Sequence, residues 1–193
     1  TSAIGAPEAV LISFAAASLA KYYNIPCRTG GSLSDAKCVD YQAGQESTLT
    51  MLAAMMTSTS FILHSCGVMN SFNTLSYEKY LLDEQNIEMI RKIVNGMKIF
   101  TGDKELENIS DVGPGGQYIS EEHTMEYMYS ELYTTRLFNK MGYPSWVKEG
   151  KKDAARLAGE KIEERLESFE YPDITKEQES VLREYIGDLY DAI

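Results

Sequence analysis

The sequence predicts an α/β fold in which parallel strands alternate with helices. Two short apolar segments, residues 24–31 and 60–67, are the predicted strands, and a segment with helical periodicity follows each of them. Short connections and strict alternation are typical of parallel strands joined by helical crossovers. Two strands alone cannot form a stable sheet or a closed barrel. We therefore interpret the chain as the C-terminal part of a larger α/β unit.

Three helices are predicted in the first hundred residues. Residues 7–22 begin with Pro7 and Glu8, which favour the first turn of a helix. The apolar face of this helix is expected to contain Val10, Leu11, Phe14, Ser18 and Leu19. Residues 39–58 have helical spacing at Leu49, Leu52, Ala53 and Met56. Residues 76–100 are predicted to form a long amphipathic helix.

Beyond residue 100 the pattern becomes entirely helical. A loop with a short helix comes first, and three helices are expected after it: residues 120–133 with Ser120 as the cap, residues 145–169, and residues 175–193 with a capping box of Thr175 and Gln178. We expect residues 1–100 to hold the βα units. Residues 101–193 then form a loop and a helical extension of the same domain.

Composition excludes several classes of partner. The chain has 193 residues, of which 44% are hydrophobic, and a formal net charge of −11, which repels nucleic acids. No apolar run approaches the roughly 20 residues that span a bilayer, so we expect no membrane partner. The three cysteines lack CxxC spacing, which indicates a reducing, cytoplasmic location and no disulfide framework or zinc site. No metal site is expected.

Small and polar residues follow both predicted strands at their C-terminal ends. Thr29 to Ser32 leave the first strand, and His64 to Gly67 leave the second. Ligands bind outside the carboxyl ends of parallel strands, and neighbouring strands lie about 4.8 Å apart, so the two loops would share one rim. Each residue also has a structural alternative: a core histidine for His64, a turn for Gly30 and Gly31, solvated charges for Asp35 and Lys37, a helix cap for Asp40, and packing for Cys38 and Cys66.

Four segments together resemble the trimethylamine methyltransferase family. In chain order they are "LAKYYNIPCRTGGSLSDAKCVDYQAGQESTLTMLAAM", "SFILHSCGVMNSFNTLSYEKYLLDEQ", "VGPGGQYISEEHTMEYM" and "LFNKMGYPSWVKEGKKDA". The resemblance runs through nearly all of the chain. It implies transfer of a methyl group from a methylated amine to the cobalt of a corrinoid protein. It also implies that the chain is the C-terminal portion of a (β/α)8 TIM barrel followed by C-terminal helices, with the N-terminal half of the barrel missing.

The resemblance also implies the partners. We expect a cognate corrinoid protein that carries the corrinoid, no cofactor bound directly by this chain, a small methylated amine as substrate, and a homo-oligomer. Trimethylamine enzymes of the family carry pyrrolysine, encoded by an in-frame amber codon, whereas other members act on quaternary amines such as glycine betaine. This chain contains no non-standard residue, which favours the members that act on quaternary amines. A further hypothesis is that the chain starts in mid-barrel because of a break at or near an unusual codon. The alternatives are a barrel enzyme with a pterin acceptor and a truncated, non-catalytic paralogue that binds a corrinoid protein.

His64 is the predicted catalytic residue, as a donor that orients a substrate carboxylate. An aromatic and acidic pocket would hold a quaternary ammonium by cation–π and charge interactions. The predicted substrate-binding residues are Gly30, Gly31, Ser32, Asp35, Lys37, Gln42, Glu46, Tyr77 and Tyr118. The resemblance places these segments at the barrel mouth, with Tyr77 and Tyr118 as expected walls of the cage.

Overall fold

A computed structural model describes residues 3–57, 59–99 and 102–187. The chain divides into two compact units, Thr1–Ile162 and Glu163–Ile193. Every predicted site residue lies in the first unit. The predicted division near residue 100 between βα units and a helical extension stays a prediction.

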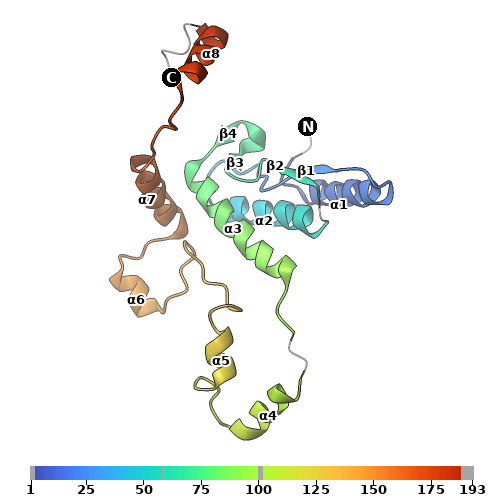
Figure 1. Ribbon diagram of the computed structural model, residues 1–193, viewed down its shortest axis with the longest axis vertical. Coiled ribbons are helices and arrows are strands. Elements are labelled where there is room, and N and C mark those ends of the chain that lie inside the picture. Colours follow the sequence, from blue (N-terminus) through green and yellow to red (C-terminus); the bar gives the residue numbers. More distant parts are fainter. Residues whose placement is uncertain (1–2, 58, 100–101, 188–193) are drawn as a thin grey trace. The chain divides into compact units, whose positions relative to one another are not determined.

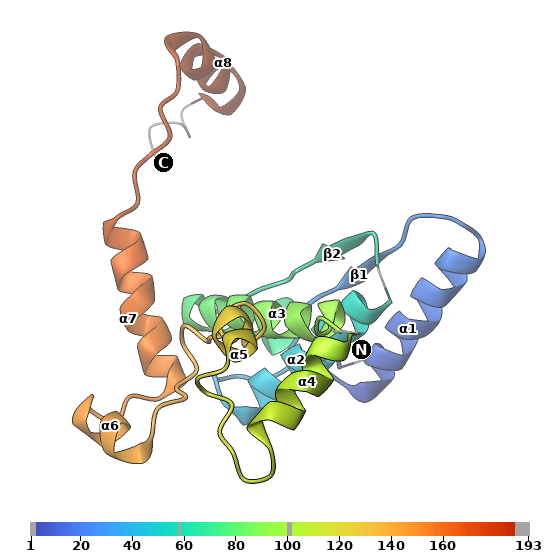
Figure 2. The same ribbon diagram turned by 60° about the horizontal axis from the view of Figure 1, so that its bottom comes forward.

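The first part of the chain has the predicted alternation of helices and strands (Figure 1). Its elements are α1 (Pro7–Tyr22), β1 (Arg28–Gly30), α2 (Tyr41–Met56), β2 (Phe61–Leu63), β3 (Val68–Met69), the 3-10 turn η1 (Asn70–Phe72), β4 (Thr74–Leu75) and α3 (Tyr77–Asn95). Strands β1 and β2 are neighbours and parallel, with Thr29 opposite Ile62. In both Figure 1 and Figure 2 the three helices lie on the same side of this pair. The predicted α/β arrangement is therefore confirmed for these two βα units, while closure into a barrel stays a prediction.

Both parallel strands are shorter than the predicted ranges 24–31 and 60–67. Asn24 has a φ of 53° and His64 a φ of 55°, and a left-handed residue cannot continue a ladder of extended backbone. The sequence predicts that the chain leaves the strand after His64. The structure also contains a short antiparallel pair that the sequence did not predict, β3–β4, in which Val68 lies opposite Leu75.

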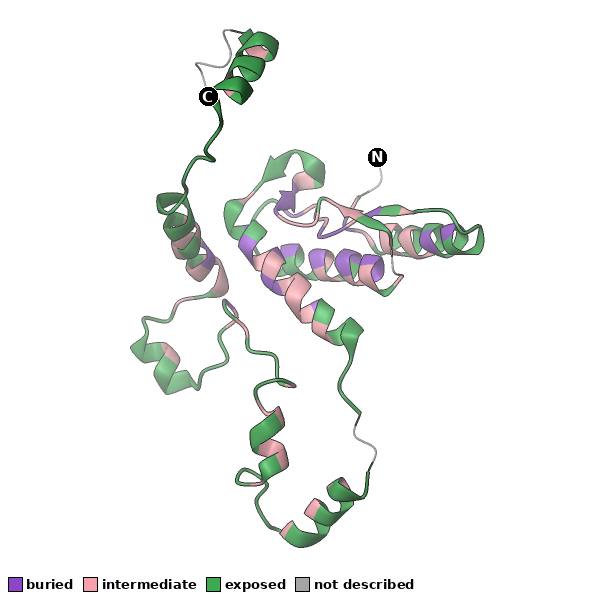
Figure 3. Ribbon diagram, in the orientation of Figure 1, coloured by how far each residue is buried: buried purple, intermediate pink, exposed green. Residues whose placement is uncertain are grey.

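Small residues, not the predicted large ones, form the buried faces of the first two helices. In α1 the buried residues are Ala17 and Ala20, whereas Leu11 and Leu19 are 67% and 58% exposed. The predicted apolar face of α1 is therefore wrong. In α2 the buried residues are Ala43, Ser47, Thr50, Met51, Ala53 and Ala54. Figure 3 shows this burial along α2, which contacts both α1 and α3. A helix packed on several sides needs small side chains so that its neighbours can approach closely.

The predicted face of α2 is also largely wrong. Of its four predicted members, Ala53 is buried, whereas Leu49 and Met56 are 40% and 60% exposed. The predicted N-cap is confirmed, because the Asp40 carboxylate accepts a hydrogen bond of 3.1 Å from the backbone N–H of Ala43. Helix α3 begins as predicted, after its N-cap Ser76, but it ends at Asn95, short of the predicted residue 100. Its C-cap is Gly96, whose φ of 73° is unfavourable for residues with a side chain.

The later helices are shorter than predicted. They are α4 (Asp103–Val112), α5 (Glu122–Tyr127), α6 (Tyr143–Lys148), α7 (Ala154–Glu167) and α8 (Lys176–Ile186). The predicted cap Ser120 is wrong, because Glu121 occupies the N-cap of α5. The single helix predicted over 145–169 is broken near Gly150, which has a φ of 88°.

One detail of the helical part is confirmed, because Thr175 and Gln178 form the predicted capping box of α8. On α7, an ion pair of Arg156 with Glu160 spans 3.6 Å. The last residues of the predicted helix 175–193, from 188 onward, lie outside the described residues, as do residues 100–101. Within residues 3–57, 59–99 and 102–187, no helix has both the length and the apolar character that crossing a membrane requires.

Candidate active site

The loops that follow β1 and β2 meet at the C-terminal ends of these strands. The backbone N–H of Gly31 donates a hydrogen bond of 2.9 Å to the carbonyl of Leu63. A Cβ placed on Gly31 would lie 2.9 Å from the backbone Cα of Ser65 and 2.7 Å from the Cε of Met51. Gly31 therefore lets the two loops touch. The structure thus brings the two loops to the shared rim that the sequence predicted.

This close approach predicts opposite effects for two glycine substitutions. Gly31→Ala is expected to lower the free energy of unfolding by about 2 kcal/mol, because the added methyl group pushes against backbone. Gly44→Ala is the matched control, because a Cβ on this exposed helical residue would meet nothing within 4 Å. It should raise stability by about 0.5–1 kcal/mol. Urea unfolding measures both changes, and equal effects would contradict the proposed close contact.

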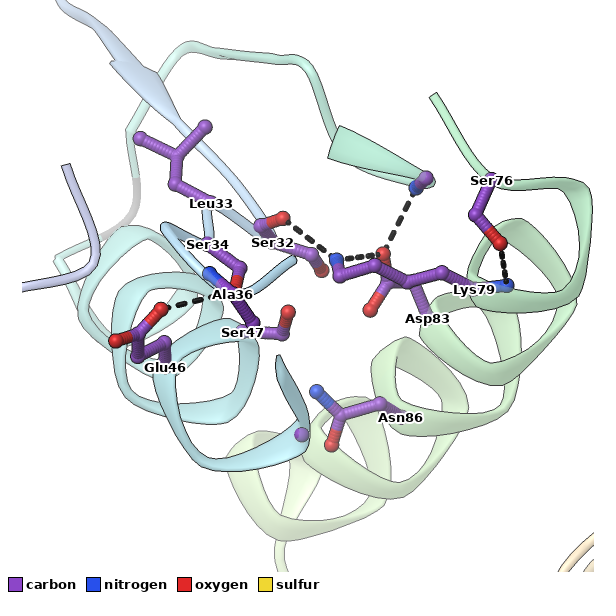
Figure 4. Close-up of polar contacts among 12 residues, drawn as sticks. Ser32, Leu33, Ser34, Ala36, Glu46, Ser47, Ser76, Lys79, Asp83 and Asn86 are labelled. Atoms are coloured by element: carbon purple, nitrogen blue, oxygen red, sulfur yellow. Dashed lines mark hydrogen bonds and ion pairs between the residues drawn. The ribbon is translucent and has the colours of Figure 1, made fainter. Parts of the chain in front are cut away.

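The carboxylate of Glu46 organises the loop after β1. Its Oε2 accepts hydrogen bonds of 2.8 Å from the hydroxyl of Ser34 and from the backbone N–H of Asp35. Its Oε1 accepts a hydrogen bond of 2.8 Å from the side-chain amide of Gln42. Figure 4 shows Glu46 reaching from α2 toward Ser34 in this loop. Both oxygens thus have donors within the chain, and the predicted role of Glu46 and Gln42 in substrate binding stays a prediction.

Asp35 joins this loop to two other segments. Its carboxylate accepts a hydrogen bond of 2.9 Å from the backbone N–H of Gly5 and another from the hydroxyl of Ser71. Burial pushes the pKa of Asp35 upward, but the hydrogen bonds from Ser71 and Gly5 outweigh that effect, so the pKa lies below its ordinary value. The ionised carboxylate stabilises the rim at neutral pH, and this contribution is lost as the pH falls through the lowered pKa. Lys37 donates a 2.6 Å hydrogen bond to the carbonyl of Asp35.

His64 is exposed at the end of β2 and is not a core histidine in this chain. Its ring lies edge-on against Phe72, with 4.9 Å between the ring centroids. Phe72 is half exposed and is the neighbour of Ser71, which bonds Asp35. The turn Asn70–Phe72 therefore contacts both His64 and Asp35. It joins the histidine to the network of the first loop.

Strain accompanies this turn. Asn70, Ser71 and Phe72 have φ values of 49°, 53° and 72°, so three successive residues with side chains are left-handed. Each such residue costs about 1–2 kcal/mol, and strain of this kind is found where surrounding contacts hold a functional geometry. Sequence reasoning missed the turn, although the sequence "NSFN" contains residues that tolerate left-handed backbone.

A buried ion pair lies beneath the rim and was also missed. Lys79 and Asp83 of α3 are only 2% and 3% exposed, and their charged atoms are 2.5 Å apart. Lys79 also donates a 3.1 Å hydrogen bond to the carbonyl of Ser32, and Asp83 accepts one of 2.8 Å from the backbone N–H of Gly67 (Figure 4). Burial raises the pKa of Asp83, against the opposing effect of Lys79. The i,i+4 spacing of the two residues in a predicted helix was the available signal.

Cys66 comes directly before Gly67, and its part-buried thiol is expected to react slowly. Burial, followed by the charges of Asp83 and Glu84, raises the pKa of Cys66 to about 12. At pH 8 such a thiol has about a thousandfold less thiolate than an ordinary cysteine. We expect iodoacetamide to alkylate Cys66 at least 100-fold more slowly in the folded protein than in the same protein in urea, as followed by peptide mass spectrometry. Equal rates in both conditions would contradict this environment.

The two predicted cage tyrosines are exposed, and their role as walls of a cage stays a prediction. Tyr77 is exposed at the first position of α3, and Tyr118 is exposed in the loop between α4 and α5. In the part of the chain that the structure describes, no hydrogen bond or ring contact joins either of them to the rim residues. That part also holds no group of three His, Cys, Asp or Glu side chains that could bind a metal ion. Phe72 places an aromatic side chain beside His64 at this rim.

Comparison with known proteins assigns the family. The family model described as "Trimethylamine methyltransferase (MTTB)" matches residues 1–189. The chain belongs to the trimethylamine methyltransferase family. The resemblance seen in the sequence is therefore confirmed.

Three relatives show the range of substrates among members of the family. The chain is 36% identical to an L-carnitine:corrinoid methyltransferase of Eubacterium limosum over 97% of its own length and 39% of that protein. It is 34% identical to a glycine betaine methyltransferase of Desulfitobacterium hafniense, over 95% of its length and 38% of that protein. It is 31% identical to a trimethylamine methyltransferase of Methanosarcina mazei, over 94% of its length and 37% of that protein. The chain thus spans less than two fifths of each of these methyltransferases.

Proposed function

We propose that the chain is the C-terminal part of an enzyme that moves a methyl group from a methylated amine to the Co(I) of a cognate corrinoid protein. Membership of the trimethylamine methyltransferase family and the printed activities of the relatives support this. The observation that carries the proposal is the meeting of two loops at the C-terminal ends of parallel strands, with His64 exposed beside Phe72. Ligand sites of parallel α/β units lie at this end.

The reaction needs positioning more than it needs a protein nucleophile. The electron pair of Co(I) attacks the methyl carbon, the C–N bond breaks, and its electron pair stays on nitrogen. A quaternary ammonium leaves as a neutral amine, so no general acid is required, whereas a free tertiary amine must be protonated or bound to an electrophile. The task of the rim is then to hold the N–CH3 group in line with cobalt.

We favour a quaternary amine as the methyl donor. The carnitine and glycine betaine relatives are 36% and 34% identical to the chain, against 31% for the trimethylamine relative above. Carnitine and betaines carry a carboxylate, which suits a hydrogen-bond donor at an exposed rim position such as His64. Phe72 offers an aromatic surface for the ammonium group.

The rest of the barrel is part of the proposal. The two βα units described here have helices on one side of β1 and β2, as the wall of a (β/α)8 barrel requires. The large apolar side chains exposed on α1, such as Leu11, Ile12 and Leu19, fit contact with a neighbouring unit. We propose that a preceding segment supplies the other strands, and that the complete protein is cytoplasmic.

A non-catalytic role is the second candidate. This candidate is a truncated paralogue or subunit that binds a corrinoid protein without catalysis. The two candidates differ in whether upstream sequence continues the barrel, in frame or across an amber codon.

One experiment tests the proposal. The complete protein is incubated with reduced cobalamin and a panel of trimethylamine, glycine betaine, carnitine and proline betaine, and methylcobalamin is followed by its absorbance. We expect methylcobalamin with a quaternary amine. Formation with trimethylamine alone would overturn the preferred substrate class, and no product with any amine, with or without a corrinoid protein, would favour the non-catalytic role.

A further inference from the structure

The buried ion pair of Lys79 and Asp83 bonds backbone groups of two different loops. Lys79 donates to the carbonyl of Ser32, in the loop after β1, and Asp83 accepts from the N–H of Gly67, in the loop after β2. The two residues also bond each other at 2.5 Å. One turn of α3 thus ties the two loops of the rim to each other. Figure 4 shows Lys79 pointing from α3 toward Ser32.

Stability alone is a weak reason for such a pair. Removing two charges from water is costly, and well-packed apolar residues of similar volume are often as stable as a buried ion pair. An apolar pair could fill the space under the rim, but it could not bond a carbonyl and an N–H on two different loops. The pair is therefore suited to fixing loop geometry, and catalysis by positioning depends on such geometry.

The anchored atoms lie close to the predicted reacting region. Ser32 follows Gly31, the residue through which the two loops touch, and Gly67 lies three residues after His64. A shift of either loop would move Gly31 and Ser32 relative to the His64 ring. Lys79 and Asp83 are too buried to reach a substrate at the rim themselves.

We propose that Lys79 and Asp83 are positioning residues, which set the spacing between the two rim loops for methyl transfer. The proposal rests on the proposed function. It adds that the pair acts through Ser32 and Gly67, and that the pair is needed for the rate of the reaction more than for the fold.

The test uses the complete protein with both charges replaced by apolar groups of similar volume. Single variants such as Asp83→Asn leave one buried charge without its partner, so loss of folding in them would be uninformative. The double variant Lys79→Met with Asp83→Leu avoids this. The matched control is Lys92→Met. Lys92 lies on α3, as Lys79 and Asp83 do, and the substitution removes its part-exposed ion pair with Glu131.

Hydrogen exchange provides a measure that does not require activity. In the double variant the amide of Gly67 should exchange about tenfold faster, because it has lost its acceptor. The control should leave that exchange unchanged. Unchanged exchange at Gly67 in a folded double variant would overturn the anchoring, whatever the enzyme assay shows.

Kinetics then separates positioning from stability. In the folded double variant we expect kcat for methyl transfer to fall at least tenfold with KM changed less than threefold, because the substrate still binds but is misaligned. Full activity with faster exchange would overturn the positioning role, since the pair would then be purely structural. If the unaltered protein forms no methylcobalamin, the proposed function and the positioning role both fail, while hydrogen exchange still tests the anchoring.

Discussion

Replacing His64 by alanine is expected to lower kcat/KM for methyl transfer from a betaine about 100-fold without unfolding the protein. A hydrogen bond to a charged group contributes about 1.5–3 kcal/mol, and this sets the expected loss. His64 is exposed and contacts Phe72 only at the edge of the ring, so its removal should leave packing nearly unchanged. The measurement is methylcobalamin formation by the complete protein, together with a thermal unfolding curve.

Two controls sharpen this result. His64→Gln keeps a hydrogen-bond donor at the rim and should recover part of the lost activity. Phe72→Leu removes the ring beside His64 but no donor, so any loss should be smaller and should appear mainly in KM. Unchanged activity of His64→Ala would remove His64 from the site, and a lowered unfolding temperature would show that its role is structural.

Glu46→Ala is expected to lower the free energy of unfolding by about 3 kcal/mol. The substitution removes the acceptor of two inner donors, the hydroxyl of the fully buried Ser34 and the backbone N–H of Asp35. A buried donor left without a partner costs about 1–3 kcal/mol. The measurement is urea unfolding of the complete protein, with the native protein as the reference.

Glu46→Gln is the matched control for this prediction. The amide oxygen can still accept from Ser34 and Asp35, and the amide of Gln42 can rotate to accept from the new NH2 group. We expect a loss below about 1 kcal/mol and little change in KM. If Glu46→Gln keeps its stability but raises KM tenfold or more, the carboxylate binds the ammonium of the substrate, as the sequence predicted.

The sequence was sufficient for the alternation of the first three helices with the two parallel strands and for the position of the rim. Apolar periodicity and the residues at the ends of each segment are local signals, and they predicted α1 at its observed bounds and the cap Asp40. Parallel pairing of β1 and β2 follows from the alternation of strands and helices. Because parallel strands end on the same side, the meeting of the loops at Gly31 and Ser65 could be predicted without coordinates.

Other features depended on tertiary contacts. The buried face of α2 could not be read from spacing, because α1 and α3 both contact it and bury small residues rather than Leu49 and Met56. The same holds for the left-handed turn that carries Ser71 and Phe72.

By itself, then, the sequence determined the family, the alternating α/β pattern and the end of the strands at which a ligand site is expected. Only the tertiary structure decided which polar residues hold that end together. The contact of Lys79 with Ser32 joins residues 47 positions apart, and the contact of Asp35 with Ser71 joins residues 36 apart. Local propensity predicts neighbours within a few residues, whereas these contacts exist because strand pairing brings distant loops together. Burial then makes a hydrogen-bond partner necessary for the charged group of Lys79.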